Sequence, residues 1–72
     1  MVNINKLKGK IVEKGIKVSV LAESIGIDAS TLYRKFKSNG ETISIKEANL
    51  IVKSLNLTPE EAVAIFFDKN VA

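Results

Sequence analysis

The chain has 72 residues, a formal net charge of +3, and neither cysteine nor histidine. This length predicts one domain, residues 1–72, which side-chain packing must stabilise, because no disulfide or thiolate metal site can form. Without histidine or cysteine the chain lacks the commonest general base, the thiolate nucleophile and most transition-metal ligands, so we expect neither an enzyme nor a bound cofactor.

The N-terminal segment predicts a helix of about ten residues. Either Asn3 or Asn5 can cap its start, and Gly15 is a natural end. Its core face is expected to carry Ile4, Leu7, Ile11 and Val12. Gly9 inside the helix costs up to about 1 kcal/mol relative to alanine, which suggests close packing against a neighbour.

Residues 17–37 predict two short helices joined by a tight turn. Apolar residues at helical spacing mark the buried face of the first helix, at about residues 18–25: Val18, Leu21, Ala22 and Ile25. Gly26 follows, where a helix end needs a residue that tolerates a left-handed backbone. Asp28 is a strong N-cap for the second helix, at about residues 29–38, through a carboxylate that accepts an early amide hydrogen bond. Leu32 and Phe36 mark the buried face of that helix.

The segment LAESIGIDASTLYRK in this region resembles the helix-turn-helix of the phage repressor and Cro family, the XRE-like family. These positions carry the resemblance: Leu21, Ala22, Gly26, Ile27, Ser30, Thr31 and Leu32. The resemblance implies an all-α, compact five-helix domain of lambda-repressor-like architecture, with the helix-turn-helix at about residues 17–38. It also implies that the second helix of the motif enters the major groove of double-stranded DNA.

Carried over by motif position, the resemblance assigns base contacts to Ala29, Ser30 and Arg34. An arginine can form a bidentate contact to guanine that is worth roughly 1–3 kcal/mol of discrimination. Ala29 offers only an apolar contact, such as one to a thymine methyl group. The alternative for Arg34, Lys35 and Lys37 is an ordinary exposed last turn, where cations suit the helix dipole.

The resemblance assigns sugar–phosphate contacts to residues on both helices: Lys17, Ser19, Thr31, Tyr33 and Lys37. Family members often begin the first helix with Thr-Gln, in which the threonine is the cap and the glutamine touches a phosphate. This chain has Lys17-Val18 instead, so the cap is poor and the glutamine contact cannot form. Lys17 can replace that contact with a less directional charge contact.

Two more helices are predicted in the C-terminal part. Ser44 followed by Glu47 forms a capping box for a helix at about residues 45–55. The last helix is expected to begin after Thr58, with Thr58 as its N-cap and Pro59 at its first position. The apolar stripe of the first of these helices consists of Ala48, Ile51, Val52 and Leu55.

The C-terminal helix ends in the adjacent residues Phe66 and Phe67. A helical stripe cannot bury both side chains equally, so we expect one in the core and the other as an anchor for self-association. The alternative is a hydrophobic end of the chain that covers its own core.

The charges are unevenly distributed. Residues 1–37 carry eight basic and three acidic side chains, a balance of +5, whereas residues 38–72 carry three basic and five acidic ones, a balance of −2. A basic half joined to an acidic half indicates one polyanion-facing surface. The alternative is that the lysines are simply solvated surface residues.

No apolar run approaches the roughly 20 residues that span a bilayer, and the start of the chain lacks the apolar stretch of a secretory signal. We therefore expect a cytoplasmic protein, bacterial or from a phage, that binds no membrane.

The resemblance to the phage repressor and Cro family implies a sequence-specific regulator of transcription, Cro-like or a small repressor, of phage or prophage origin. Its expected partners are an operator in double-stranded DNA and a second copy of the chain, at least when DNA is bound. The length leaves no room for a ligand-sensing domain, so no small-molecule ligand is expected. The alternative is a protein-interaction module on the same fold, such as an antitoxin-like or anti-repressor adaptor, which the missing glutamine and the modest net charge favour.

Overall fold

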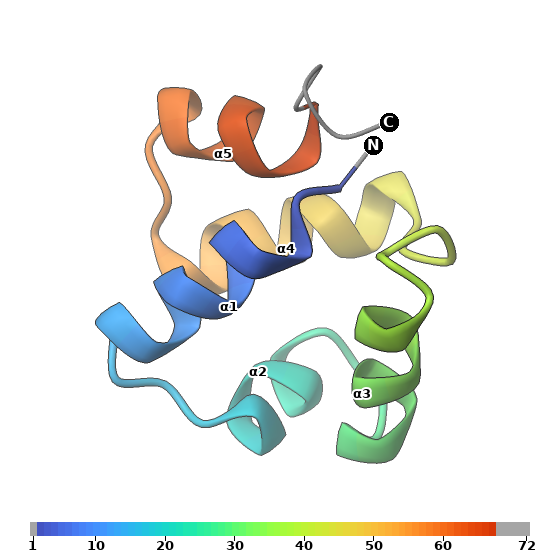
Figure 1. The fold of residues 1–72 in the computed structure, drawn as a ribbon. Coiled ribbons are helices and arrows are strands. Elements are labelled where there is room, and N and C mark those ends of the chain that lie inside the picture. The colour runs from blue at the N-terminus through green and yellow to red at the C-terminus, as the bar shows by residue number, and fades with distance from the viewer. Residues whose placement is uncertain (1, 68–72) are drawn as a thin grey trace.

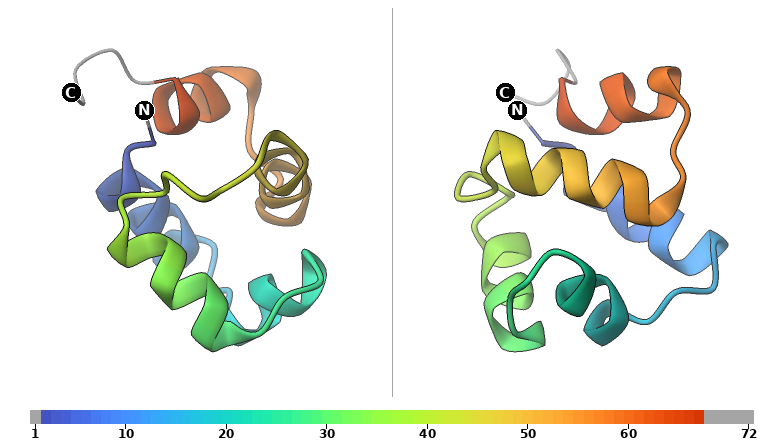
Figure 2. Two further views of the ribbon diagram at one scale, coloured as in Figure 1. Left: turned by 90° about the vertical axis from the view of Figure 1, so that its right-hand side faces the viewer. Right: turned by 180° about the vertical axis from the view of Figure 1, so that it is seen from behind.

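The computed structural model describes residues 2–67, which form five helices and, within that range, no strand. The helices are α1 (Ile4–Glu13), α2 (Val18–Ser24), α3 (Ala29–Lys37), α4 (Ile45–Leu55) and α5 (Pro59–Phe66). Helices α2 and α3 lie at one end of the molecule and α5 at the other, with α1 and α4 between them (Figure 1 and Figure 2). The predicted all-α fold of five helices is confirmed.

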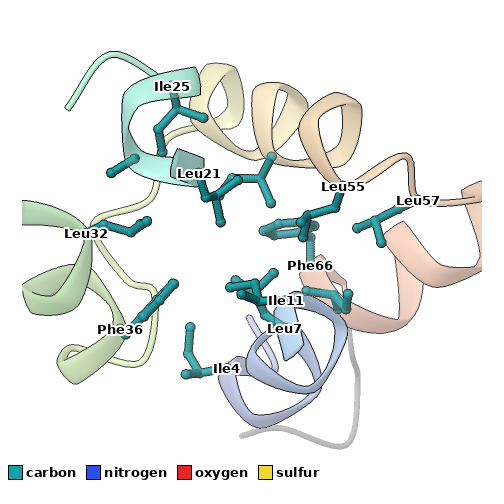
Figure 3. Close-up of a cluster of buried hydrophobic side chains, with 13 residues drawn as sticks. Ile4, Leu7, Ile11, Leu21, Ile25, Leu32, Phe36, Leu55, Leu57 and Phe66 are labelled. Atoms are coloured by element: carbon teal, nitrogen blue, oxygen red, sulfur yellow. The ribbon is translucent and has the colours of Figure 1, made fainter. Parts of the chain in front are cut away.

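One cluster of buried apolar side chains joins all five helices (Figure 3). Its most deeply buried large members are Leu7, Leu21, Leu32, Ile51, Leu55 and Ile65. Every helix contributes at least one of them. Because burying a side chain of this size favours folding by about 1.5–3 kcal/mol, each helix is fixed chiefly by this shared core.

Helices α1, α4 and α5 begin with side-chain caps. The Asn3 side chain accepts a hydrogen bond from an amide in the first turn of α1 at 3.0 Å. Ser44 begins α4 and Thr58 begins α5, each in a complete capping box with Glu47 or Glu61. The caps predicted at Ser44 and Thr58 are thus confirmed, and each such cap is worth about 1 kcal/mol.

Helices α2 and α3 begin differently. Lys17 and Asp28 occupy their N-cap positions with an extended backbone, but neither side chain makes a capping hydrogen bond. For Lys17 this is the poor cap that the sequence predicts. For Asp28 the predicted carboxylate–amide bond is wrong, because the exposed carboxylate makes no hydrogen bond to an amide of α3.

Two predictions for α1 are also wrong. Val12 is 79% exposed, because it follows the buried Ile11 directly and each residue turns a helix by about 100°. Gly9 lies in no close contact, since a Cβ atom placed there would meet nothing within 4 Å.

The adjacent phenylalanines at the end of α5 separate clearly. Phe66 is 7% exposed and belongs to the core, whereas Phe67 is 71% exposed. Phe66 is therefore unable to anchor a second subunit in this conformation, and only Phe67 stays a candidate for self-association. The backbone N–H of Asn3 donates to the carbonyl of Ile65 at 2.6 Å, which ties the start of α1 to α5.

Candidate nucleic-acid interface

The turn between α2 and α3 fixes how the two helices meet. Gly26 has a φ of +79°, and its N–H donates to the Glu23 carbonyl at 3.1 Å. The N–H of Ile27 donates to the Ala22 carbonyl at 3.0 Å. These two bonds form a Schellman motif, which satisfies the last carbonyls of α2 and turns the chain directly into α3.

Helix α3 presents one exposed face at helical spacing, made of Ser30, Tyr33, Arg34 and Lys37. Its opposite face carries Leu32 and Phe36, both buried. The Tyr33 and Phe36 rings meet edge to face, with their centroids 6.5 Å apart. The core therefore holds α3 by one side and leaves the other side open along its whole length.

Arg34 is oriented by its own helix. Its Nη2 donates to Oγ1 of the half-buried Thr31 at 3.3 Å, one turn earlier. Arginine carries five N–H donors, so this bond leaves the guanidinium able to donate to a further acceptor.

The start of α2 lies beside the start of α3. Ser19 of α2 and Ala29 and Thr31 of α3 line the same open hollow, whose volume is about 600 Å³. Lys17 is exposed at the N-cap of α2. Ala29 packs partly against the core, so only part of its methyl group faces outward. The structure thus brings predicted contact residues from both helices onto one surface.

Two carboxylates lie on that surface as well. Glu23 and Asp28 are exposed and line the hollow beside Ser19 and Ala29. Sequence reasoning gave Asp28 only a capping role and gave Glu23 none. The spacing of Ser19 and Glu23, four residues apart in α2, was the signal that could have placed Glu23 there.

Lys35 does not belong to the exposed cations of α3. Its side chain is only 16% exposed, with Nζ 2.8 Å from the carbonyl oxygen of Thr42 and 3.3 Å from Oε1 of Glu47. The alternative of an ordinary exposed last turn is therefore wrong for Lys35, while Arg34 and Lys37 are exposed as expected. No sequence pattern showed the partners of Lys35, because they come from the next loop and from α4.

Within residues 2–67 no group of three or more histidine, cysteine, aspartate or glutamate side chains is arranged to hold a metal ion. In the same range, no helix is both long and apolar enough to cross a membrane.

Residues 6–68 match a family model described as the Cro/C1-type HTH DNA-binding domain. No curated protein and no solved structure matches the chain. The matched range contains α2, α3 and the turn between them, together with every residue predicted to contact DNA.

Proposed function

This chain belongs to the family of Cro/C1-type HTH DNA-binding domains, and from that premise we propose that it is a sequence-specific regulator of transcription. Membership bears out the resemblance to the phage repressor and Cro family, and it supports binding to double-stranded DNA in general. The proposal is that α3 enters the major groove of an operator. The observation that carries it is the open polar face of α3 opposite the buried Leu32 and Phe36.

Ala29, Ser30 and Arg34 are the proposed base contacts. Arg34 supports this role best, because Thr31 already orients its guanidinium, and an arginine can bind guanine through two hydrogen bonds. Ser30 is exposed one turn earlier and can donate to or accept from a base. Ala29 contributes an apolar edge.

Residues around this face are the proposed contacts to the DNA backbone: Lys17, Ser19, Thr31, Tyr33 and Lys37. Lys17 and Lys37 are exposed cations near the start of α2 and at the end of α3. The first amides of α2 have no side-chain cap, and Ser19 lies in that first turn, so hydrogen-bond donors are available there for phosphate oxygens.

We further propose that the chain, as a single domain of residues 1–72, binds its operator as a homodimer and acts as a small repressor, Cro-like and of phage or prophage origin, in the cytoplasm. Val63 and Phe67 support self-association, because they are 56% and 71% exposed and lie one turn apart at the end of α5. Paired half-sites about 34 Å apart would match such a dimer.

The test is selection from a random DNA pool at two salt concentrations, with the wild type, Arg34→Ala and Lys53→Ala. Lys53 is an exposed cation on α4 and serves as the matched control. We expect an enriched palindrome whose binding weakens with salt, a lost base preference in Arg34→Ala, and an unchanged preference in Lys53→Ala. A wild type that enriches no sequence would defeat the proposal.

A second candidate function is a protein-interaction module such as an antitoxin-like or anti-repressor adaptor. The observation in its favour is the pair Glu23 and Asp28, whose charges oppose phosphate beside the start of α3. The salt dependence separates the two functions, because an apolar protein interface responds to salt far less than phosphate contacts do.

A further inference from the structure

Lys35 and Lys37 are chemically identical and two residues apart on the proposed reading helix, yet their surroundings differ. Lys37 is exposed, whereas the Lys35 side chain is 16% exposed and its ammonium group has two partners. Nζ donates to the Thr42 carbonyl at 2.8 Å and lies 3.3 Å from Oε1 of Glu47. Two of its three N–H donors are therefore directed into the protein.

The partner oxygen on Glu47 has another contact. Oε1 accepts the backbone N–H of Ser44 at 2.9 Å, and Ser44 Oγ accepts the backbone N–H of Glu47 at 3.1 Å. The same carboxylate thus closes the capping box of α4 and pairs with α3. The hydrogen bond from the Ser44 backbone N–H, followed by the contact with Lys35, lowers the pKa of Glu47 below its ordinary value.

The backbone of Lys35 is fixed at the same place. Its carbonyl accepts the N–H of Gly40 at 2.9 Å and the hydroxyl of Ser38 at 2.9 Å. Gly40 in turn packs closely on the N-terminal segment, because a Cβ atom at this position would lie 2.8 Å from Cβ of Val2. Residues 38–44 are thereby anchored to α3, to α4 and to the start of the chain.

We infer that Lys35 is a positioning residue for DNA reading: it holds α3 and residues 38–44 in a fixed orientation against α4 and makes no contact with phosphate. This inference rests on the proposed function. A helix that reads bases must be held in one orientation in the groove, whereas a phosphate contact tolerates displacement. Loss of Lys35 should therefore lower the sequence specificity of binding more than it lowers the electrostatic attraction to DNA.

The experiment compares Lys35→Met with Lys37→Met, after circular dichroism has verified that each variant is folded. The affinity of each is measured for the selected operator and for an operator with one mismatched base pair, over a range of salt concentrations. We expect Lys37→Met to reduce the salt slope by about 0.9 per subunit, or about 1.8 for the proposed dimer, and to keep its discrimination. Lys35→Met should keep the salt slope of the wild type. Its discrimination between the two operators should fall at least about fivefold, which is the low end of the cost of one mismatched base pair. Glu47→Gln should also lower discrimination, and the double variant Lys35→Met/Glu47→Gln should discriminate no worse than either single variant. Lys35→Arg should keep the discrimination of the wild type.

A Lys35→Met variant with the slope of Lys37→Met would show a phosphate contact and overturn the inference, as would one that matches the wild type in slope and discrimination. If Lys35→Met does not fold, amine acetylation of the wild type decides. Lys35 should react slowly with and without DNA, whereas Lys37 should react readily until DNA protects it, and equal reactivity of the two in the free protein would overturn the inference. If the wild type selects no DNA, the proposed function is defeated instead. The acetylation rates of Lys35 and Lys37 in the free protein still test the contacts of Lys35.

Discussion

The pair α2–α3 and the group α1, α4 and α5 are stabilised in different ways. Each helix of the group begins with a side-chain cap, at Asn3, Ser44 or Thr58. Neither Lys17 nor Asp28 caps its helix in the pair. Within residues 2–67, side-chain capping at helix starts is thus confined to the helices that support the fold, and no side chain caps the helix starts proposed to face DNA.

The difference has a consequence for stability. Helix α2 has seven residues, too few for a helix to persist in water by itself. Without caps, α2 and α3 depend on the shared core, in which Leu21 and Leu32 are fully buried. We therefore expect the pair to fold only together with α1, α4 and α5.

Leu32→Ala should have the largest effect. It removes a fully buried side chain from α3 and should lower the free energy of unfolding by about 2–5 kcal/mol, with Leu7→Ala in α1 as the matched control of similar cost. Tyr33, the single tyrosine of a chain without tryptophan, gives a fluorescence signal from α3 alone. In urea it should change together with the circular dichroism of all helices. A tyrosine transition at lower urea would mean that α2 and α3 unfold separately.

Caps provide a sharper comparison of the two regions. Thr58→Ala removes a capping hydrogen bond and should lower the free energy of unfolding by about 0.5–2 kcal/mol. Asp28→Ala removes no such bond and should cost less. It loses only the favourable interaction of a carboxylate with the helix dipole, which is worth roughly 0.3–1 kcal/mol. Chemical denaturation measures both. Equal costs would mean that Asp28 does cap α3 in solution.

Local chemistry makes several helix ends predictable, because a cap and its amide lie within a few residues of each other. Ser44, Thr58 and Gly26 were identified on that basis. The exposure of Val12 follows from its position one residue after Ile11, whereas the burial of Lys35 depends on where the next loop and α4 lie. The choice between Phe66 and Phe67 likewise needed the packing of α5 on α1.

The same limit applies to the candidate interface. Motif position located Ser30, Arg34 and Lys37 on α3, and the structure places all three on one exposed face. Motif position does not show that Glu23 lines the hollow with Ala29 and Thr31, because Glu23 comes from α2. Spacing within one helix can be read from the sequence, whereas the charge that a second helix adds depends on the angle between the two.

The smallest expected effect concerns the ion pair that joins α1 to α5; within residues 2–67 no ion pair joins α2 to α3. Lys10 Nζ lies 2.5 Å from Oε2 of Glu61 and 2.9 Å from Oε2 of Glu13. Lys10, followed by the Thr58 amide, lowers the pKa of Glu61 from its ordinary 4.5 to about 2. Because the folded state holds this carboxylate deprotonated, its contribution is complete above the unfolded pKa and is lost as the pH falls toward 2.

The melting temperature should therefore fall between pH 4.5 and pH 2, and it should fall less steeply in Glu61→Gln. Glu60→Gln is the matched control, because it removes a carboxylate from the same turn and leaves both pairs of Lys10 intact. The effect should be small, since exposed ion pairs contribute little, and it should shrink further at high salt. Equal slopes for the wild type and Glu61→Gln would mean that the pair does not hold α1 against α5 in solution.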